Sequence, residues 1–289
     1  MVQVDVFWSY GIGASLATAA AYQLRSADAR RAGRWSDPYL LGSTLYCAVL
    51  FAPSGAWLLW GFPDWETMQT AGGHGSLPPW LVALFAATNV SQGVLGYWVA
   101  ARLIARGRVY AAFLQAGLGY AGMFFILVHG WDGRGYQRFF SADRDTFAAW
   151  PRHPGLGQAL SRAGDWLASP VALTLYGMGA VIVPAMLALI VSWVRSGQLA
   201  AGGADGGMVA GRLRIVAAVL GAVFGVALGT AVAASVLVHL LGWWLGVPVA
   251  AAVTLLFVVR PETGAAHRVF LLLGLPDRRI GLPSSALQE

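Results

Sequence analysis

The sequence predicts an all-α integral membrane protein, a bundle of seven transmembrane helices. Three observations predict this class. Hydrophobic residues make up 57% of the 289 residues and charged residues 11%, whereas soluble domains carry roughly 25% charged residues. Seven uncharged stretches are long enough to cross about 30 Å of hydrocarbon. Most of the arginines gather in alternate connections between these stretches, as the positive-inside rule expects of a multi-pass protein.

Seven uncharged windows define the predicted spans in chain order. They cover residues 6–24, 39–62, 80–101, 109–130, 171–194, 215–241 and 243–259. The first window precedes its arginines, the reverse of the order in a signal peptide, so a retained span is predicted. The apolar tract that holds the last two windows is interrupted by Gly242, Gly246 and Pro248, which predict a tight hairpin there. One long tilted helix, which leaves six spans in total, is the alternative.

Three connections complete a single membrane domain over residues 1–289. Residues 131–170 form a cap of about 40 residues, the one substantial water-facing segment. Within it, residues 156–167 place Leu156, Leu160 and Leu167 on one helical face, which predicts a helix resting on the membrane. Residues 196–211 are rich in glycine and alanine and predict a flexible cytoplasmic linker. Residues 260–289 form a cytoplasmic tail.

The arginines also predict the orientation. Of 19 arginines, 14 fall on the side that holds the linker and the tail, and the other five lie in the cap. This asymmetry places the N-terminus and the cap outside and the C-terminus in the cytoplasm. The chain has no lysine, which excludes a retinal Schiff base and is typical of a GC-rich bacterial genome. The predicted location is the cytoplasmic (inner) membrane of a bacterium.

Glycines recur at helical spacing in two of the predicted spans. Gly117, Gly119 and Gly122 match a dinucleotide-binding pattern, but no strand precedes them, so close helix packing is the better interpretation. Gly221, Gly225 and Gly229 follow one another at intervals of four residues. Such a stripe predicts a groove for another helix or for a lipid-like tail.

Uncharged polar side chains lie deep in the third and fourth spans. They are Asn89, Gln92, Gln115 and Tyr120. If these spans form an antiparallel hairpin, Asn89 lies level with Tyr120, and Gln92 lies level with Gln115. Interhelical hydrogen bonds are the first interpretation, and a ligand pocket is the alternative. No Asp, Glu, Arg or Lys falls within a window, which counts against ion-coupled transport.

Histidines concentrate on the predicted outer side. His129 and His239 end the fourth and sixth spans, which run in the same direction. Neutral imidazoles bind haem iron and transition metals, so this pair is a candidate site for haem or a metal. Interfacial histidines that make ordinary hydrogen bonds are the alternative.

The cap combines turn-forming glycines, aromatic rings and charges of both signs. Its candidate residues for a ligand or partner are Trp131, Asp132, Arg134, Tyr136, Arg138, Asp143, Asp145 and His153. They predict a recognition surface outside the membrane, and a self-packed loop is the alternative.

Two classes of function follow from these residues. The first is a non-transporting membrane subunit or binding protein, whose partners are membrane lipids and a protein on the outer side. The second is a membrane enzyme that acts on a lipid-like substrate through the acidic residues and His153. A channel or transporter is a third alternative. No nucleic acid partner is expected.

Overall fold

The computed structural model describes residues 4–23, 35, 37–61, 79–106, 108–130, 133–141, 144–196 and 206–259, and its elements there are helices. The long helices are α1 (Val4–Gln23), α2 (Pro38–Gly61), α4 (Pro79–Ala105), α5 (Val109–His129), η2 (Leu173–Ile182), α10 (Val183–Ser196), α11 (Gly206–Leu241) and α12 (Trp243–Val259). Shorter helices precede η2, namely α6 (Gly135–Phe139), α7 (Arg144–Ala148), α8 (Leu156–Leu167) and α9 (Pro170–Ala172). The predicted all-helical class is confirmed.

Each predicted window coincides with a long helix, and η2 and α10 share the fifth window. Within the described part of the chain, three stretches are long and apolar enough to cross a membrane by length and composition alone. They are Ala111–His129, Gly177–Arg195 and Ala210–Leu241. The protein is therefore helical and suited to a membrane, whereas crossing by all seven helices stays a prediction.

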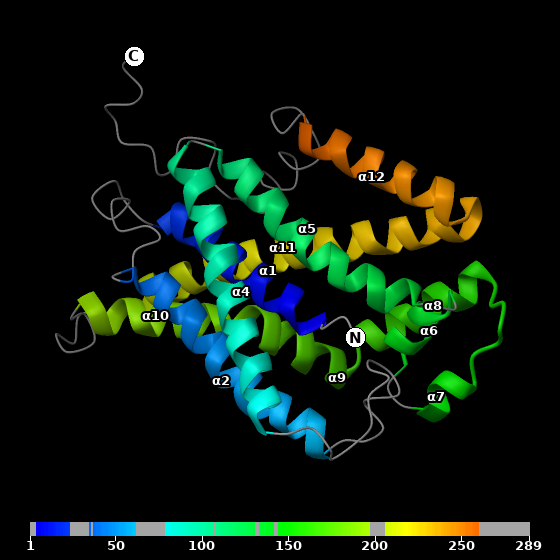
Figure 1. The fold of residues 1–289 in the computed structure, drawn as a ribbon, viewed down its shortest axis with the longest axis horizontal. Coiled ribbons are helices and arrows are strands. Elements are labelled where there is room, and N and C mark those ends of the chain that lie inside the picture. Colours follow the sequence, from blue (N-terminus) through cyan, green and yellow to red (C-terminus); the bar gives the residue numbers. More distant parts are fainter. Residues whose placement is uncertain are drawn as a thin grey trace.

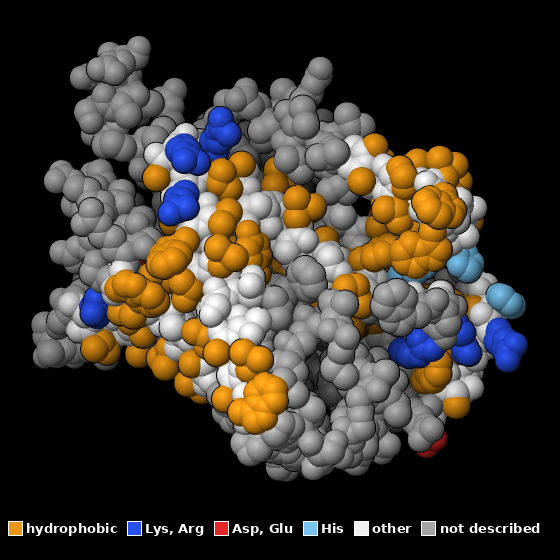
Figure 2. Space-filling model, in the orientation of Figure 1, with side chains coloured by type: hydrophobic (Ala, Val, Ile, Leu, Met, Phe, Trp, Pro, Cys, Tyr) orange, Lys and Arg blue, Asp and Glu red, His pale blue; other side chains and the backbone are white. Residues whose placement is uncertain are grey.

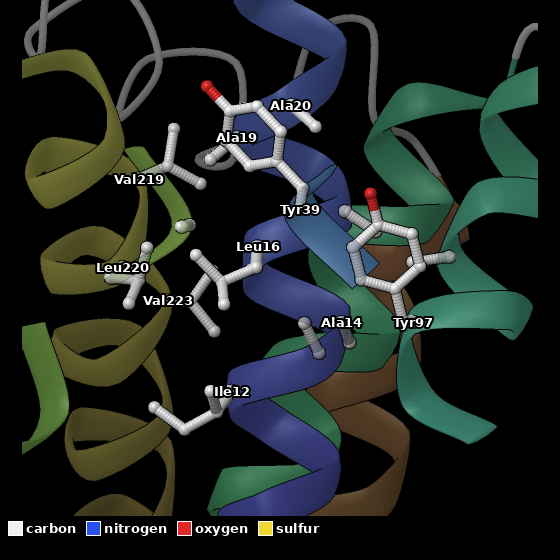
Figure 3. Packing of buried hydrophobic residues seen from close by; sticks show 14 of the residues in the cluster. Ile12, Ala14, Leu16, Ala19, Ala20, Tyr39, Tyr97, Val219, Leu220 and Val223 are labelled. Atoms are coloured by element: carbon white, nitrogen blue, oxygen red, sulfur yellow. The ribbon is translucent and has the colours of Figure 1, made fainter. Parts of the chain in front are cut away.

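Helix α1 occupies the middle of the bundle (Figure 1). It packs along α4 and α5 and also contacts α2 and α11. Residues 11–21 are all buried, and most of them are glycine, alanine, serine or threonine, which let neighbouring helices approach closely. Figure 3 shows Leu16 of α1 beside Val223 of α11, and Ala19 beside Tyr39 of α2. The first helix of the chain is thus the core of the fold.

Glycines bring α1 and α4 into backbone contact. A Cβ atom added to Gly13 would lie 1.9 Å from the carbonyl oxygen of Gly93. One added to Gly96 would lie 2.2 Å from the carbonyl oxygen of Tyr10. These two helices approach so closely that no side chain fits between them at these positions.

A π-helix, η2, precedes Pro184. In a π-helix each carbonyl accepts from the N–H five residues later, and the N–H of Val183 donates to Met178 in this way. The same pattern would pair the carbonyl of Gly179 with residue 184, but proline has no N–H. The hydroxyl of Tyr46 on α2 donates to the Gly179 oxygen instead, at 2.5 Å. Tyr46 thereby donates to the Gly179 carbonyl the hydrogen bond that Pro184 cannot donate.

Replacing Tyr46 by phenylalanine is therefore expected to lower the free energy of unfolding by about 1 kcal/mol, because the Gly179 carbonyl loses its donor. Pro184→Ala restores an N–H at the required position. In the Pro184→Ala background, Tyr46→Phe should thus cost less than in the natural chain. A double-mutant cycle measured by unfolding in mild detergent checks this. Equal costs in both backgrounds would contradict the idea that the Tyr46 hydroxyl takes the place of a backbone N–H at position 184.

The last hairpin turns at a single residue. Gly242 separates α11 from α12 with a φ of +75°, a conformation that glycine adopts without strain. The predicted break is therefore confirmed at Gly242, whereas Gly246 and Pro248 lie inside α12. Gly246 serves packing instead, because a Cβ there would lie 2.5 Å from the Cα of Val238.

The linker predicted over residues 196–211 is shorter than expected. Helix α10 continues to Ser196 and α11 begins at Gly206, so residues 206–211 are helical. Met208, Val209 and Ala210 extend the helix that follows, and a glycine at position 211 costs a helix about 1 kcal/mol. The remainder of this linker and the predicted tail, 260–289, lie outside the described residues.

Residues 133–141 and 144–169 form a cap at one end of the bundle, on the right in Figure 1. We call this the cap end. Figure 2 shows arginine side chains at the cap end and at the opposite end, with hydrophobic side chains over much of the surface between them. This distribution agrees with an apolar belt between two polar ends.

Candidate functional site

The polar side chains within the helices find their partners on α1. The Tyr10 hydroxyl donates to Oε1 of Gln115 at 2.5 Å, and Ser9 donates to Oδ1 of Asn89 at 3.5 Å. The expected pairs, Asn89 with Tyr120 and Gln92 with Gln115, are therefore wrong. Helix α1 packs more extensively against α4 and against α5 than these two pack against each other, so their polar groups meet α1 first.

Tyr120 and Gln92 are also placed by this arrangement. The ring of Tyr120 is buried and lies edge-on to Trp8, with 6.0 Å between ring centroids. It presses on Gly11, where a Cβ would lie 2.6 Å from the ring. Gln92 is half-buried on α4. Among these four mid-span residues, Gln115 keeps a buried amide nitrogen without a hydrogen bond.

Asp37 is a buried acid outside the predicted spans, because it lies two residues before the second window. It is 1% exposed. Its Oδ1 accepts from the backbone N–H of Tyr39 at 3.0 Å, and its Oδ2 accepts from the Tyr97 hydroxyl at 2.7 Å. Asp37 thereby caps the first turn of α2 and ties it to α4. The Asp-Pro pair at the start of an apolar run was the available signal.

His129 is held in an aromatic enclosure at the cap end of α5. Its Nδ1 lies 3.1 Å from the Ser235 hydroxyl of α11. Its ring stacks on Phe125 with centroids 5.3 Å apart, and it lies perpendicular to the ring of Trp243 with centroids 4.8 Å apart. Both His129 and Ser235 are buried, so this pair fastens α5 to α11.

His239 lies one helical turn beyond Ser235 on α11 and is exposed. It neighbours the turn after α5, since a Cβ on Gly133 would lie 3.9 Å from His239 Nδ1. The two candidate histidines thus lie at the same end of neighbouring helices. Within the described residues, no three His, Cys, Asp or Glu side chains gather as a metal site would need. A haem or metal held by His129 and His239 stays a prediction.

Gln137 organises the described core of the cap and was missed in the sequence. It is fully buried, and its Oε1 accepts from Nε of Arg134 at 2.6 Å. Its Nε2 donates to the Tyr136 hydroxyl at 3.1 Å and to the Pro151 carbonyl at 3.0 Å. A glutamine between arginines and aromatics gives no sequence signal of burial, because glutamine is mostly exposed in proteins.

Arginines of the cap stack on aromatic rings. Arg134 and Arg138 both lie over Phe147, at 4.9 and 5.2 Å from its centroid. These contacts and Gln137 hold Arg134, Tyr136 and Arg138 within the cap, in agreement with the self-packed alternative for these three residues. Asp145 and His153 are exposed. Trp131, Asp132 and Asp143 lie outside the described residues.

An apolar cavity of about 300 Å³ lies between α5, α11 and α12. Its lining residues are Phe113, Leu114, Gly117, Leu118, Ala121, Val226, Gly229, Thr230, Ala233, Ala234, Leu237, Ala250 and Val253. The hydroxyl of Thr230 is directed to the carbonyl of Val226 in its own helix, at 2.8 Å. The wall therefore presents hydrocarbon, which suits an apolar chain and no polar ligand.

The glycine stripe of α11 remains open. Cβ atoms added to Gly221, Gly225 or Gly229 would meet no heavy atom of the described residues within 4 Å, and the same holds for Gly117 of α5. Among the glycines of α5, Gly119 allows close packing, since a Cβ there would lie 2.8 Å from the ring of Tyr10. The sequence predicted either a helix or a lipid-like tail beside this stripe, and no described helix lies there.

The chain is similar to one protein and to one protein family that are both described as uncharacterized. A protein of Archaeoglobus fulgidus, named "Uncharacterized protein", is 40% identical over 157 residues, which are 54% of this chain and 64% of that relative. The chain thus covers less than two thirds of the relative's length. No solved structure matches. An uncharacterized membrane protein family matches residues 108–276, from the start of α5 to beyond α12. This match covers more than half of the chain, which therefore belongs to that membrane protein family.

Proposed function

We propose that this protein is a non-transporting membrane subunit or binding protein that holds a lipid-like molecule in the cavity between α5, α11 and α12. The observation that carries the proposal is this cavity of about 300 Å³ with an apolar wall. Ligand pockets begin at about this volume and are lined mainly by hydrophobic side chains. Gly117 and Gly229 widen the space by leaving it free of side chains.

The membrane arrangement is part of the proposal. All seven helices cross the cytoplasmic membrane of a bacterium, with the N-terminus and cap outside and the C-terminus inside. Long helices at every predicted window support seven crossings, and the arginines support the orientation. The uncharged windows favour binding over ion-coupled transport, because a coupling ion needs an ionisable partner at depth.

The cap is the proposed contact for a protein partner on the outer side. Arg134 and Arg138 both lie over the ring of Phe147, and Arg134 also donates a hydrogen bond to Gln137. The exposed residues of the cap include Asp145, Arg152 and His153. Their polar and charged groups are typical of the solvent-accessible rim of a protein–protein interface. These residues, rather than the stacked arginines, are the proposed partner surface.

Filling the cavity tests the proposed function. Gly229→Leu introduces a side chain into the cavity, whereas Gly221→Leu makes the same change two turns away on α11, at a position that does not line this cavity and where a Cβ would meet no described atom within 4 Å. We expect the natural protein and Gly221→Leu to retain a lipid-like molecule through purification in mild detergent, and Gly229→Leu to lose it. Mass spectrometry of extracted lipids measures this. Equal retention by both variants, or no retained molecule in any of them, would refute the proposal.

A further inference from the structure

The leucines of α8 face outward. Leu156, Leu160 and Leu167 are 76%, 63% and 48% exposed. At 100° per residue, these three side chains fall within about 40° of one another around the helix. The opposite face carries Gln158, Ser161 and Asp165. One long side of α8 is therefore apolar and uncovered in the described structure.

Contacts with the rest of the cap fix the rotation of α8. Trp166 is buried and lies 5.2 Å from Phe139 and 5.5 Å from Phe140, between ring centroids. The guanidinium of Arg162 lies 4.9 Å from the centroid of the Trp150 ring. These side chains hold one edge of the helix against the cap. The leucine face therefore cannot turn inward without breaking both contacts.

The leucine face continues into a candidate membrane span. Ser169 ends the short connection and accepts a hydrogen bond from the N–H of Ala172 at 3.2 Å. Helix α9 follows, and η2 then begins with Leu173, which is 59% exposed. Leu167 and Leu173 line the same small cavity of about 130 Å³, so the apolar surface of α8 passes directly into that of the span Gly177–Arg195.

We propose that α8 is an interfacial helix whose leucine face lies in the outermost hydrocarbon of the membrane at the cap end. The span that follows α8 presents its exposed apolar side chains to lipid, and a contiguous apolar surface meets the same lipid. An amphipathic helix with separate leucine and polar faces lies in the plane of the membrane surface. The partner of this surface is thus the lipid bilayer, and the polar face looks into water. This inference goes beyond the proposed function and does not depend on the cavity of α5, α11 and α12.

Spin labels on the two faces of α8 test the inference. Leu160→Cys lies on the leucine face and Gln158→Cys, its matched control, lies about 160° around the helix; both positions are exposed. Cys47 is buried, so labelling of the unaltered protein gives the background. The protein is placed in nanodiscs of phosphatidylethanolamine and phosphatidylglycerol.

We expect the label at position 160 to collide several-fold more often with oxygen than with a water-soluble nickel complex, and the label at position 158 to show the reverse. Equal access of the nickel complex to both labels would overturn the proposal. So would a label at position 160 that neither reagent reaches, because another protein surface would then cover the leucine face. The circular dichroism of each labelled variant checks that the helices are retained.

Discussion

Gly13→Ala is expected to lower the free energy of unfolding by about 3 kcal/mol. The added Cβ would lie 1.9 Å from the carbonyl oxygen of Gly93 and 3.1 Å from the backbone nitrogen of Tyr97. Backbone atoms cannot rotate away as a flexible side chain does, so α1 and α4 must move apart. Because α1 is the central helix, that separation weakens its contacts with α5 and α11 as well. Equilibrium unfolding in bicelles measures the loss.

Gly117→Ala is the matched control for this prediction. It makes the same substitution in a helix, at a position where a Cβ would lie within 4 Å of no heavy atom in the described part of the chain. Alanine favours a helix over glycine by about 1 kcal/mol, so this variant should be neutral or slightly more stable. Equal losses at positions 13 and 117 would show that backbone approach does not explain the effect.

Asp37→Ala is expected to cost about 3 kcal/mol of unfolding free energy. About 1 kcal/mol comes from the lost helix cap, since the Tyr39 N–H loses its acceptor. Between about 1 and 3 kcal/mol comes from the Tyr97 hydroxyl, which remains buried without the carboxylate that accepts from it. Thermal and chemical unfolding of the purified protein in detergent measure the change.

Two further variants separate these contributions. Asp37→Asn keeps one carbonyl oxygen as an acceptor and should retain part of the stability. Tyr97→Phe removes the buried hydroxyl, so in the Asp37→Ala background it should cost less than in the natural chain. Strict additivity of the two substitutions would contradict a direct role for the bond between Asp37 and Tyr97.

Helix positions were the most predictable feature of this chain. The fourth window, 109–130, ends one residue beyond α5, and the helix expected over 156–167 coincides with α8. Hydropathy identifies α5 because a helix suited to a membrane is apolar along its length, whatever its neighbours are, and the helical spacing of leucines identifies α8. Gly242 was predictable as a break for a local reason, since its positive φ suits glycine.

The candidate site was less predictable than the helices. Counting depth along a hairpin paired Gln92 with Gln115, yet Gln115 binds Tyr10, which is 105 positions away in the chain. Position along a helix shows which residues lie at the same level in the bundle. It does not show which helices are neighbours. Gln137 was missed for a related reason, because its burial comes from Arg134, Tyr136 and the carbonyl of Pro151 closing around it.

The sequence by itself determined that this protein is helical, that its long helices suit a membrane and where nearly all of them begin and end. These properties depend on the composition of each segment and on local turn residues. Tertiary structure alone decided that α1 is the central helix, that Tyr46 supplies the donor absent at Pro184, and that the stripe at Gly229 stays open. Each of these depends on which helices become neighbours, and that follows from packing between residues far apart in the chain.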